Sequence, residues 1–94
     1  MADKPPHLLI IEARYYDTVA LDPAKAVEAY RVAIATFPTD YASRVNLALL
    51  LKGRGEFDEA TTLLQEAVRL APEEPNARLN LAATYLDSGR LDEA

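Results

Sequence analysis

Residues 41–72 read YASRVNLALLLKGRGEFDEATTLLQEAVRLAP, and this stretch decides the fold. Up to Lys52, apolar residues recur at the spacing of an amphipathic helix. Gly53 and Gly55 follow, and glycine readily adopts the positive φ that often ends a helix. A second amphipathic segment then runs to Pro72, which stops it because proline cannot continue the helical hydrogen-bond ladder. The stretch therefore predicts a helix, a tight turn and a second helix.

The chain repeats itself, and the shift of one repeat carries Pro38 onto Pro72. Residues 38–60 and 72–94 then share nine identities in 23 aligned positions, whereas unrelated sequences of ordinary composition would share roughly one or two. The same shift relates part of a first, less regular unit to the middle one. We expect one domain, residues 1–94, with repeats at about 6–38, 41–74 and 75–94, the last incomplete.

This pattern, with its period of about 34 residues, resembles the tetratricopeptide repeat. In the middle unit the resemblance rests on nine residues: Leu47, Ala48, Gly55, Phe57, Ala60, Leu64, Ala67, Leu70 and Pro72. Arg44 and Arg78 stand where the family usually has an aromatic residue. The first unit, with Tyr15 and Tyr16, is similar to units found in large bacterial proteins, some of which carry kinase domains. The resemblance implies an all-α fold, an α-α superhelix of tandem helix-turn-helix repeats.

The apolar periodicity predicts helices at about 6–20, 23–36, 40–53, 56–70 and 74–88, followed by the beginning of a sixth. Small residues are expected where two helix backbones approach closely, because a larger side chain there would overpack the interface. These positions are Ala48, Ala60, Ala67 and Ala82, with leucines 47, 51, 64 and 70 beside them.

The third unit reaches Ala94 only one turn into its second helix. Repeat arrays normally carry a polar capping element at the end. We therefore expect either a fragment of a longer array or a homodimer through this uncapped end. In both cases some apolar residues stay partly uncovered in the isolated chain: Leu79, Ala82, Ala83, Tyr85 and Leu86.

The resemblance further implies that the first helix of each unit lines a concave groove that binds a peptide or partner segment. Asn46 and Asn80 occupy equivalent places, and an amide both donates and accepts hydrogen bonds, so it suits the backbone of an extended ligand. The alternative is a bond to a neighbouring helix or to solvent. The predicted groove residues are Val45, Asn46, Leu49, Lys52, Asn76, Leu79, Asn80, Ala83 and Leu86.

Family members that bind chaperone tails hold a terminal carboxylate with basic residues around these asparagines. Here the matching positions are Ile11, Tyr15, Asn76 and Asn80, so no basic partner is available. We therefore expect an apolar or amphipathic segment as the ligand rather than an acidic C-terminal tail.

Composition argues against several other functions. The net charge is −5 and basic residues occur singly, which disfavours nucleic acid as a partner. The longest apolar block, residues 8–11, is too short for a membrane span or an export signal, so we expect a cytoplasmic protein. There is no cysteine, and the only histidine, His7, has no second ligand near it, so we predict no metal, no cofactor and no enzyme activity.

Two other interpretations remain. The chain could be a structural or oligomerisation segment of a larger multidomain protein. Residues 7–17 are also similar to the opening strand of lumazine synthase, which would make the chain a fragment of that enzyme. This second interpretation requires a strand at residues 8–12, and short apolar runs are ambiguous between strand and helix.

Overall fold

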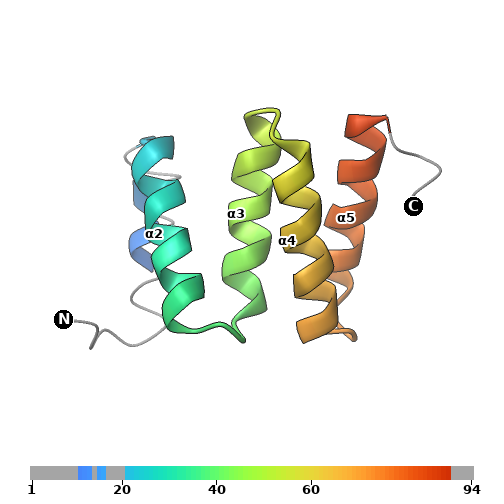
Figure 1. Cartoon of the computed structure of the whole chain (residues 1–94), viewed down its shortest axis with the longest axis horizontal. Coiled ribbons are helices and arrows are strands. Elements are labelled where there is room, and N and C mark those ends of the chain that lie inside the picture. Colours follow the sequence, from blue (N-terminus) through green and yellow to red (C-terminus); the bar gives the residue numbers. More distant parts are fainter. Residues whose placement is uncertain (1–10, 14, 17–20, 90–94) are drawn as a thin grey trace.

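The computed structural model describes residues 11–13, 15, 16 and 21–89. Its helices are α2 (Pro23–Thr36), α3 (Tyr41–Gly53), α4 (Phe57–Leu70) and α5 (Pro75–Ser88). They stand side by side in chain order (Figure 1). The four helices predicted after residue 22 are thus confirmed to within one residue at each end. The start of the predicted sixth helix lies outside the described residues.

The first predicted helix, 6–20, is described only in part, and residues 11–13 are helical. No strand occurs among the residues that the structure describes. The lumazine synthase interpretation needs residues 11 and 12 in a strand, so it is wrong. Residues 11 and 12 are helical here because the described part of the chain offers helices, and no sheet, to pack against.

Local sequence explains where the helices begin and how they are joined. Asp22 precedes α2, and its carboxylate accepts a hydrogen bond of 3.2 Å from the backbone N–H of Lys25. Pro23 and Pro75 fill the first positions of α2 and α5, where the missing N–H costs nothing. The turn between α3 and α4 has Gly55 in the left-handed region with φ of 81°.

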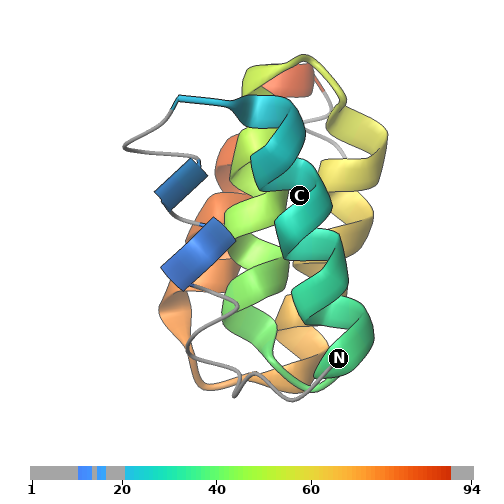
Figure 2. The same ribbon diagram turned by 90° about the vertical axis from the view of Figure 1, so that its left-hand side faces the viewer.

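The helices form two layers. Ion pairs connect alternate helices: Arg31 of α2 with Glu59 of α4, and Lys52 of α3 with Asp87 of α5. Viewed along the row, α3 and α5 lie toward one side and α2 and α4 toward the other (Figure 2). In addition, α3 packs against both α2 and α4, and α4 packs against α5. This is the arrangement of tandem helical hairpins, in which each hairpin depends on its neighbour for its core.

The core lies between the layers and is built from alanine and leucine. The predicted close-approach residues Ala48, Ala60 and Ala67 have no exposed surface, which confirms their role. Leu47, Leu51 and Leu64 fill the space beside them and are also fully buried. Dense packing of this kind provides most of the stability of a helix that is short and weakly amphipathic.

The expectations for α5 and for one leucine need correction. Ala82 is exposed and makes no close helix contact, as expected for a residue at the uncapped end, because no helix covers that side of α5 within the described residues. Tyr85, expected to be partly uncovered, is instead buried against α4, where Gln65 donates a hydrogen bond of 3.1 Å to its hydroxyl oxygen. Leu70, expected to fill the core, is 39% exposed because it is the last residue of α4.

Candidate functional site

The α3–α5 face is the surface on which the predicted groove residues lie, and α3 and α5 together supply all nine of them. Val45, Asn46, Leu49 and Lys52 come from α3. Asn76, Leu79, Asn80, Ala83 and Leu86 come from α5. The two helices are neighbours in one layer, so residues about one repeat apart in the chain share one surface.

A small hollow lies between the two helices. It encloses about 90 Å³ and is lined by Tyr41, Ala42, Val45 and Asn46 of α3 and by Asn76 of α5. Three of the predicted residues therefore meet here. The hollow is large enough for a small apolar side chain but far smaller than the pockets that hold cofactors or drug-sized ligands.

Asn46 and Asn80 lie half-buried, one on each helix. Neither side-chain amide forms a hydrogen bond with another residue in the described part of the chain. The Thr84 hydroxyl donates at 2.7 Å to the main-chain carbonyl of Asn80 and not to its side chain. The alternative considered from the sequence, a bond to a neighbouring helix, is thus not what the described residues show. Both amides keep their donors and acceptors for solvent or a ligand.

Exposed apolar side chains accompany the amides. Leu79 and Leu86 are 67% and 62% exposed, and Leu49 is 38% exposed. Large apolar residues left in water on one helix face are typical of interaction surfaces. Val45 was predicted as a groove residue, but it is only 7% exposed, so it belongs mainly to the core and contributes little more than part of the lining of the small hollow.

Lys52 has a role that the sequence did not indicate. Its ammonium group lies 3.2 Å from the carboxylate of Asp87, so it joins α3 to α5 at one end of the face. A lysine that is paired with a carboxylate of its own chain is less available to an acidic ligand. This pair supports the expectation that an acidic tail is not the preferred ligand.

Tyr41 is not among the predicted groove residues, yet it lines the hollow. Its pKa is raised above the ordinary value of 10.0, first by partial desolvation and then by the nearby Glu74 carboxylate, which also accepts its hydrogen bond. The phenol therefore stays protonated at neutral pH. Its position at the start of α3 is the signal that could have placed it beside Asn76 near the start of α5.

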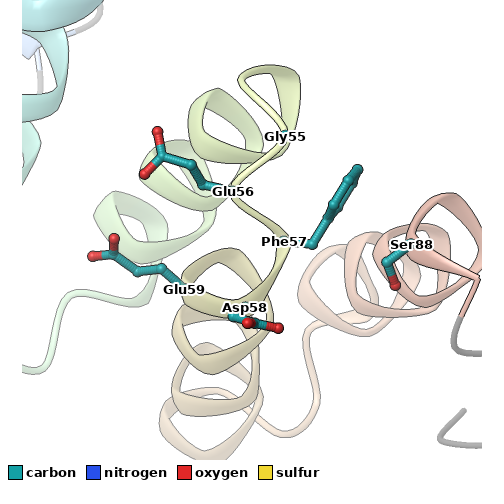
Figure 3. A pocket seen from close by; sticks show the side chains of 6 residues that line it. All are labelled: Gly55, Glu56, Phe57, Asp58, Glu59 and Ser88. Atoms are coloured by element: carbon teal, nitrogen blue, oxygen red, sulfur yellow. The ribbon is translucent and has the colours of Figure 1, made fainter.

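A larger hollow lies at the turn after α3, and three of the residues that line it are acidic (Figure 3). It encloses about 510 Å³ and is lined by Gly55, Glu56, Phe57, Asp58, Glu59 and Ser88. Two of its acids are already engaged, Glu59 with Arg31 and Glu56 with Arg54 at 3.3 Å. No group of three or more potential metal ligands occurs in the described residues.

Comparison with known proteins agrees with this architecture. Residues 53–94 match the model of the tetratricopeptide repeat family, a window that includes α4 and α5. No curated protein matches the chain. Among the helices described, none is long and apolar enough to cross a membrane.

Proposed function

The chain carries tetratricopeptide repeats, which are generally non-catalytic modules for protein–protein contact, and from this premise we propose that its α3–α5 face binds an extended segment of a partner protein. The observation that carries the proposal is the pair Asn46 and Asn80. The two amides have equivalent positions in successive repeats, lie on adjacent helices, and have no hydrogen-bond partner among the described residues.

The amides act as clamps for the ligand backbone. Each can accept a hydrogen bond from a peptide N–H and donate one to a peptide carbonyl. Such contacts hold a strand without reading its sequence. They also position the ligand side chains over the surface between α3 and α5.

The apolar residues supply the preference for one ligand over another. Leu79 and Leu86 lose exposed surface when a partner covers them, and each Å² of buried apolar surface contributes about 25 cal/mol. The hollow of about 90 Å³ admits one small apolar side chain beside Val45. The ligand is therefore an apolar or amphipathic segment, and no bond is made or broken in it.

A test needs a probe, because the natural partner is not specified by these features. Peptides selected from a random display library against the purified chain supply one. In an ¹⁵N-labelled sample, the selected peptide should shift the side-chain amide signals of Asn46 and Asn80 and the backbone signals of Leu79 and Leu86. Thr62, which is exposed on α4 in the opposite layer, serves as the control position and should not shift.

The competing function is that of a spacer or oligomerisation segment in a larger protein. It predicts that the library gives no binder, or a binder whose shifts avoid α3 and α5. Either result would remove the proposed function. The exposed leucines of α5 would then be explained as contacts within an assembly.

A further inference from the structure

One end of the α3–α5 face is acidic. Asp40 and Glu74 are one repeat apart and immediately precede α3 and α5, which begin at the same edge of the molecule, the lower one in Figure 1. The backbone N–H of Asp40 donates to the Phe37 carbonyl and that of Glu74 to the Ala71 carbonyl, each at 3.0 Å. Both acids are half-buried, and neither side chain forms a hydrogen bond that caps its own helix. The repeat therefore places two carboxylates in equivalent positions at the start of the two helices.

The two carboxylates lie beside the small hollow that Asn46 helps to line. Glu74 accepts a hydrogen bond from the hydroxyl of Tyr41, and Tyr41 lines the hollow. After desolvation, Glu74 and the charge of Asp40 are the causes that raise the pKa of Tyr41, so both acids act on this end of the face. Asp40 also accepts a hydrogen bond of 2.6 Å from the Ser43 hydroxyl. One hydrogen bond does not saturate a carboxylate, whose two oxygens offer about four acceptor sites.

No basic side chain between residues 21 and 89 neutralises this end of the face. None of the ion pairs in that range includes either acid. Arg44 of α3 is engaged by Glu66 of α4 at 3.1 Å. Arg78 lies two residues beyond Asn76, roughly 200° around α5, and lines a separate hollow on the side of α5 that meets α4. The negative charge beside the small hollow is therefore left for a ligand to balance.

The face thus has two different ends, because the other end carries the balanced pair of Lys52 and Asp87. We propose that Glu74, with Asp40 adding negative charge, binds a lysine or arginine side chain of the partner segment, while a small apolar residue beside it fills the hollow. This assignment rests on the proposed function and gives its ligand a charge and an orientation. A charge-assisted hydrogen bond of this kind adds specificity to the backbone contacts of the amides.

The probe is the peptide selected from the random display library, synthesised with an acetylated amino terminus so that only a side chain can supply the cation. It should contain lysine or arginine, and replacing that residue by glutamine should weaken binding roughly threefold to tenfold. Glu74→Gln in the chain should give a loss of similar size. Glutamine keeps a carbonyl that can accept the Tyr41 hydrogen bond, so the hollow retains its shape.

Glu28→Gln is the matched control. Glu28 is exposed on α2 in the opposite layer, and its replacement changes the net charge of the chain by the same amount. This variant should bind the peptide like the unsubstituted chain. Equal affinities for Glu74→Gln and Glu28→Gln would overturn the proposal. A selected peptide without a basic residue, or one that binds only when its amino terminus is free, would also overturn it.

Charge exchange tests whether the two groups meet. Glu74→Lys should weaken binding more than Glu74→Gln does, and a peptide whose basic residue is replaced by glutamate should bind the Glu74→Lys chain better than the unsubstituted chain. A general loss of folding cannot imitate that recovery. Absence of recovery would contradict direct contact between Glu74 and the basic side chain.

The amide variants separate this proposal from the proposed function. A peptide that loses affinity with Asn46→Ala and Asn80→Ala, but binds Glu74→Gln and the unsubstituted chain equally, would overturn the assignment of charge alone. A peptide that is insensitive to both amide substitutions would remove the proposed function and, with it, the assignment that rests on it.

Discussion

Gly55 and Gly89, which lie one repeat apart, adopt the same left-handed conformation, with φ of 81° and 79°. Each donates its N–H to a carbonyl near the end of the preceding helix, Gly55 to Lys52 at 3.0 Å and Gly89 to Leu86 at 3.2 Å. The sequence repeat is therefore also a repeat of backbone geometry at the end of α3 and of α5. Only glycine adopts this conformation without steric cost.

The turn after α3 gives a matched pair of substitutions. Gly55→Ala should destabilise the chain by about 1–2 kcal/mol, because alanine is strained at positive φ. Gly53→Ala should be neutral or stabilising by up to about 1 kcal/mol, because Gly53 is helical and nothing lies within 4 Å of an added methyl group. Urea unfolding followed by circular dichroism measures both. Equal effects would contradict the role assigned to Gly55.

A second pair compares one repeat position in two environments. Ala48→Leu should cost about 1–3 kcal/mol because Ala48 is fully buried between helices. Ala82→Leu, at the equivalent position, should change the free energy of unfolding by less than about 0.5 kcal/mol because Ala82 is exposed. Thermal unfolding of the two variants measures this difference. A large loss of stability for Ala82→Leu would mean that this side of α5 is covered.

Two buried threonines should respond oppositely to valine. The Thr61 hydroxyl has no hydrogen-bond partner among the described residues, so Thr61→Val should stabilise the chain by about 1 kcal/mol. The Thr84 hydroxyl donates to the Asn80 carbonyl, so Thr84→Val should not stabilise it and should cost about 0.5–1.5 kcal/mol. Denaturant midpoints of the two variants give the comparison. If Thr61→Val were as harmful as Thr84→Val, the Thr61 hydroxyl would have a partner.

The Arg31–Glu59 ion pair should make stability depend weakly on pH. The hydrogen bond from Arg31, opposed in part by desolvation, lowers the pKa of Glu59 below its ordinary value of 4.5. A lowered folded-state pKa contributes stability that is complete above 4.5 and is lost as the pH falls through the lowered value. The side chains are 49% and 41% exposed, so a double-mutant cycle with alanine should give about 0.2–1 kcal/mol of coupling at pH 7.

Repeating the double-mutant cycle at several pH values tests whether charge carries the Arg31–Glu59 interaction. The coupling should be unchanged between pH 7 and pH 5 and should shrink as the pH falls below Glu59's ordinary value of 4.5. Coupling that persists at low pH would show that the two side chains interact through packing rather than through charge. Added salt should reduce the coupling at pH 7 for the same reason.

Much of the fold was predictable because the sequence repeats, so each structural signal occurs at two equivalent positions. The shift of one repeat aligned Gly55 with Gly89 and Ala48 with Ala82, and these positions define the turns and the close helix contacts. Where the equivalence failed, the cause was the environment. Ala82 repeats Ala48 in sequence but not in burial, since burial depends on a neighbouring helix.

The candidate site was less predictable. The sequence indicated the amides, whose equivalence follows from the repeat, but it did not indicate the pair Lys52–Asp87. Shifted by one repeat, Lys52 corresponds to Leu86 and Asp87 to Gly53, so the repeat contains no trace of this contact. Such ion pairs depend on how adjacent helices are placed, which periodicity does not specify.

The affinity of a library-selected peptide for amide variants tests the central claim most directly. Isothermal titration calorimetry should show roughly tenfold weaker binding for Asn46→Ala and for Asn80→Ala, and a larger loss for the double variant, because each substitution removes hydrogen bonds to the ligand backbone. Thr62→Ala on α4 should bind like the unsubstituted chain. Affinities that remain the same in the double variant would contradict binding at the α3–α5 face.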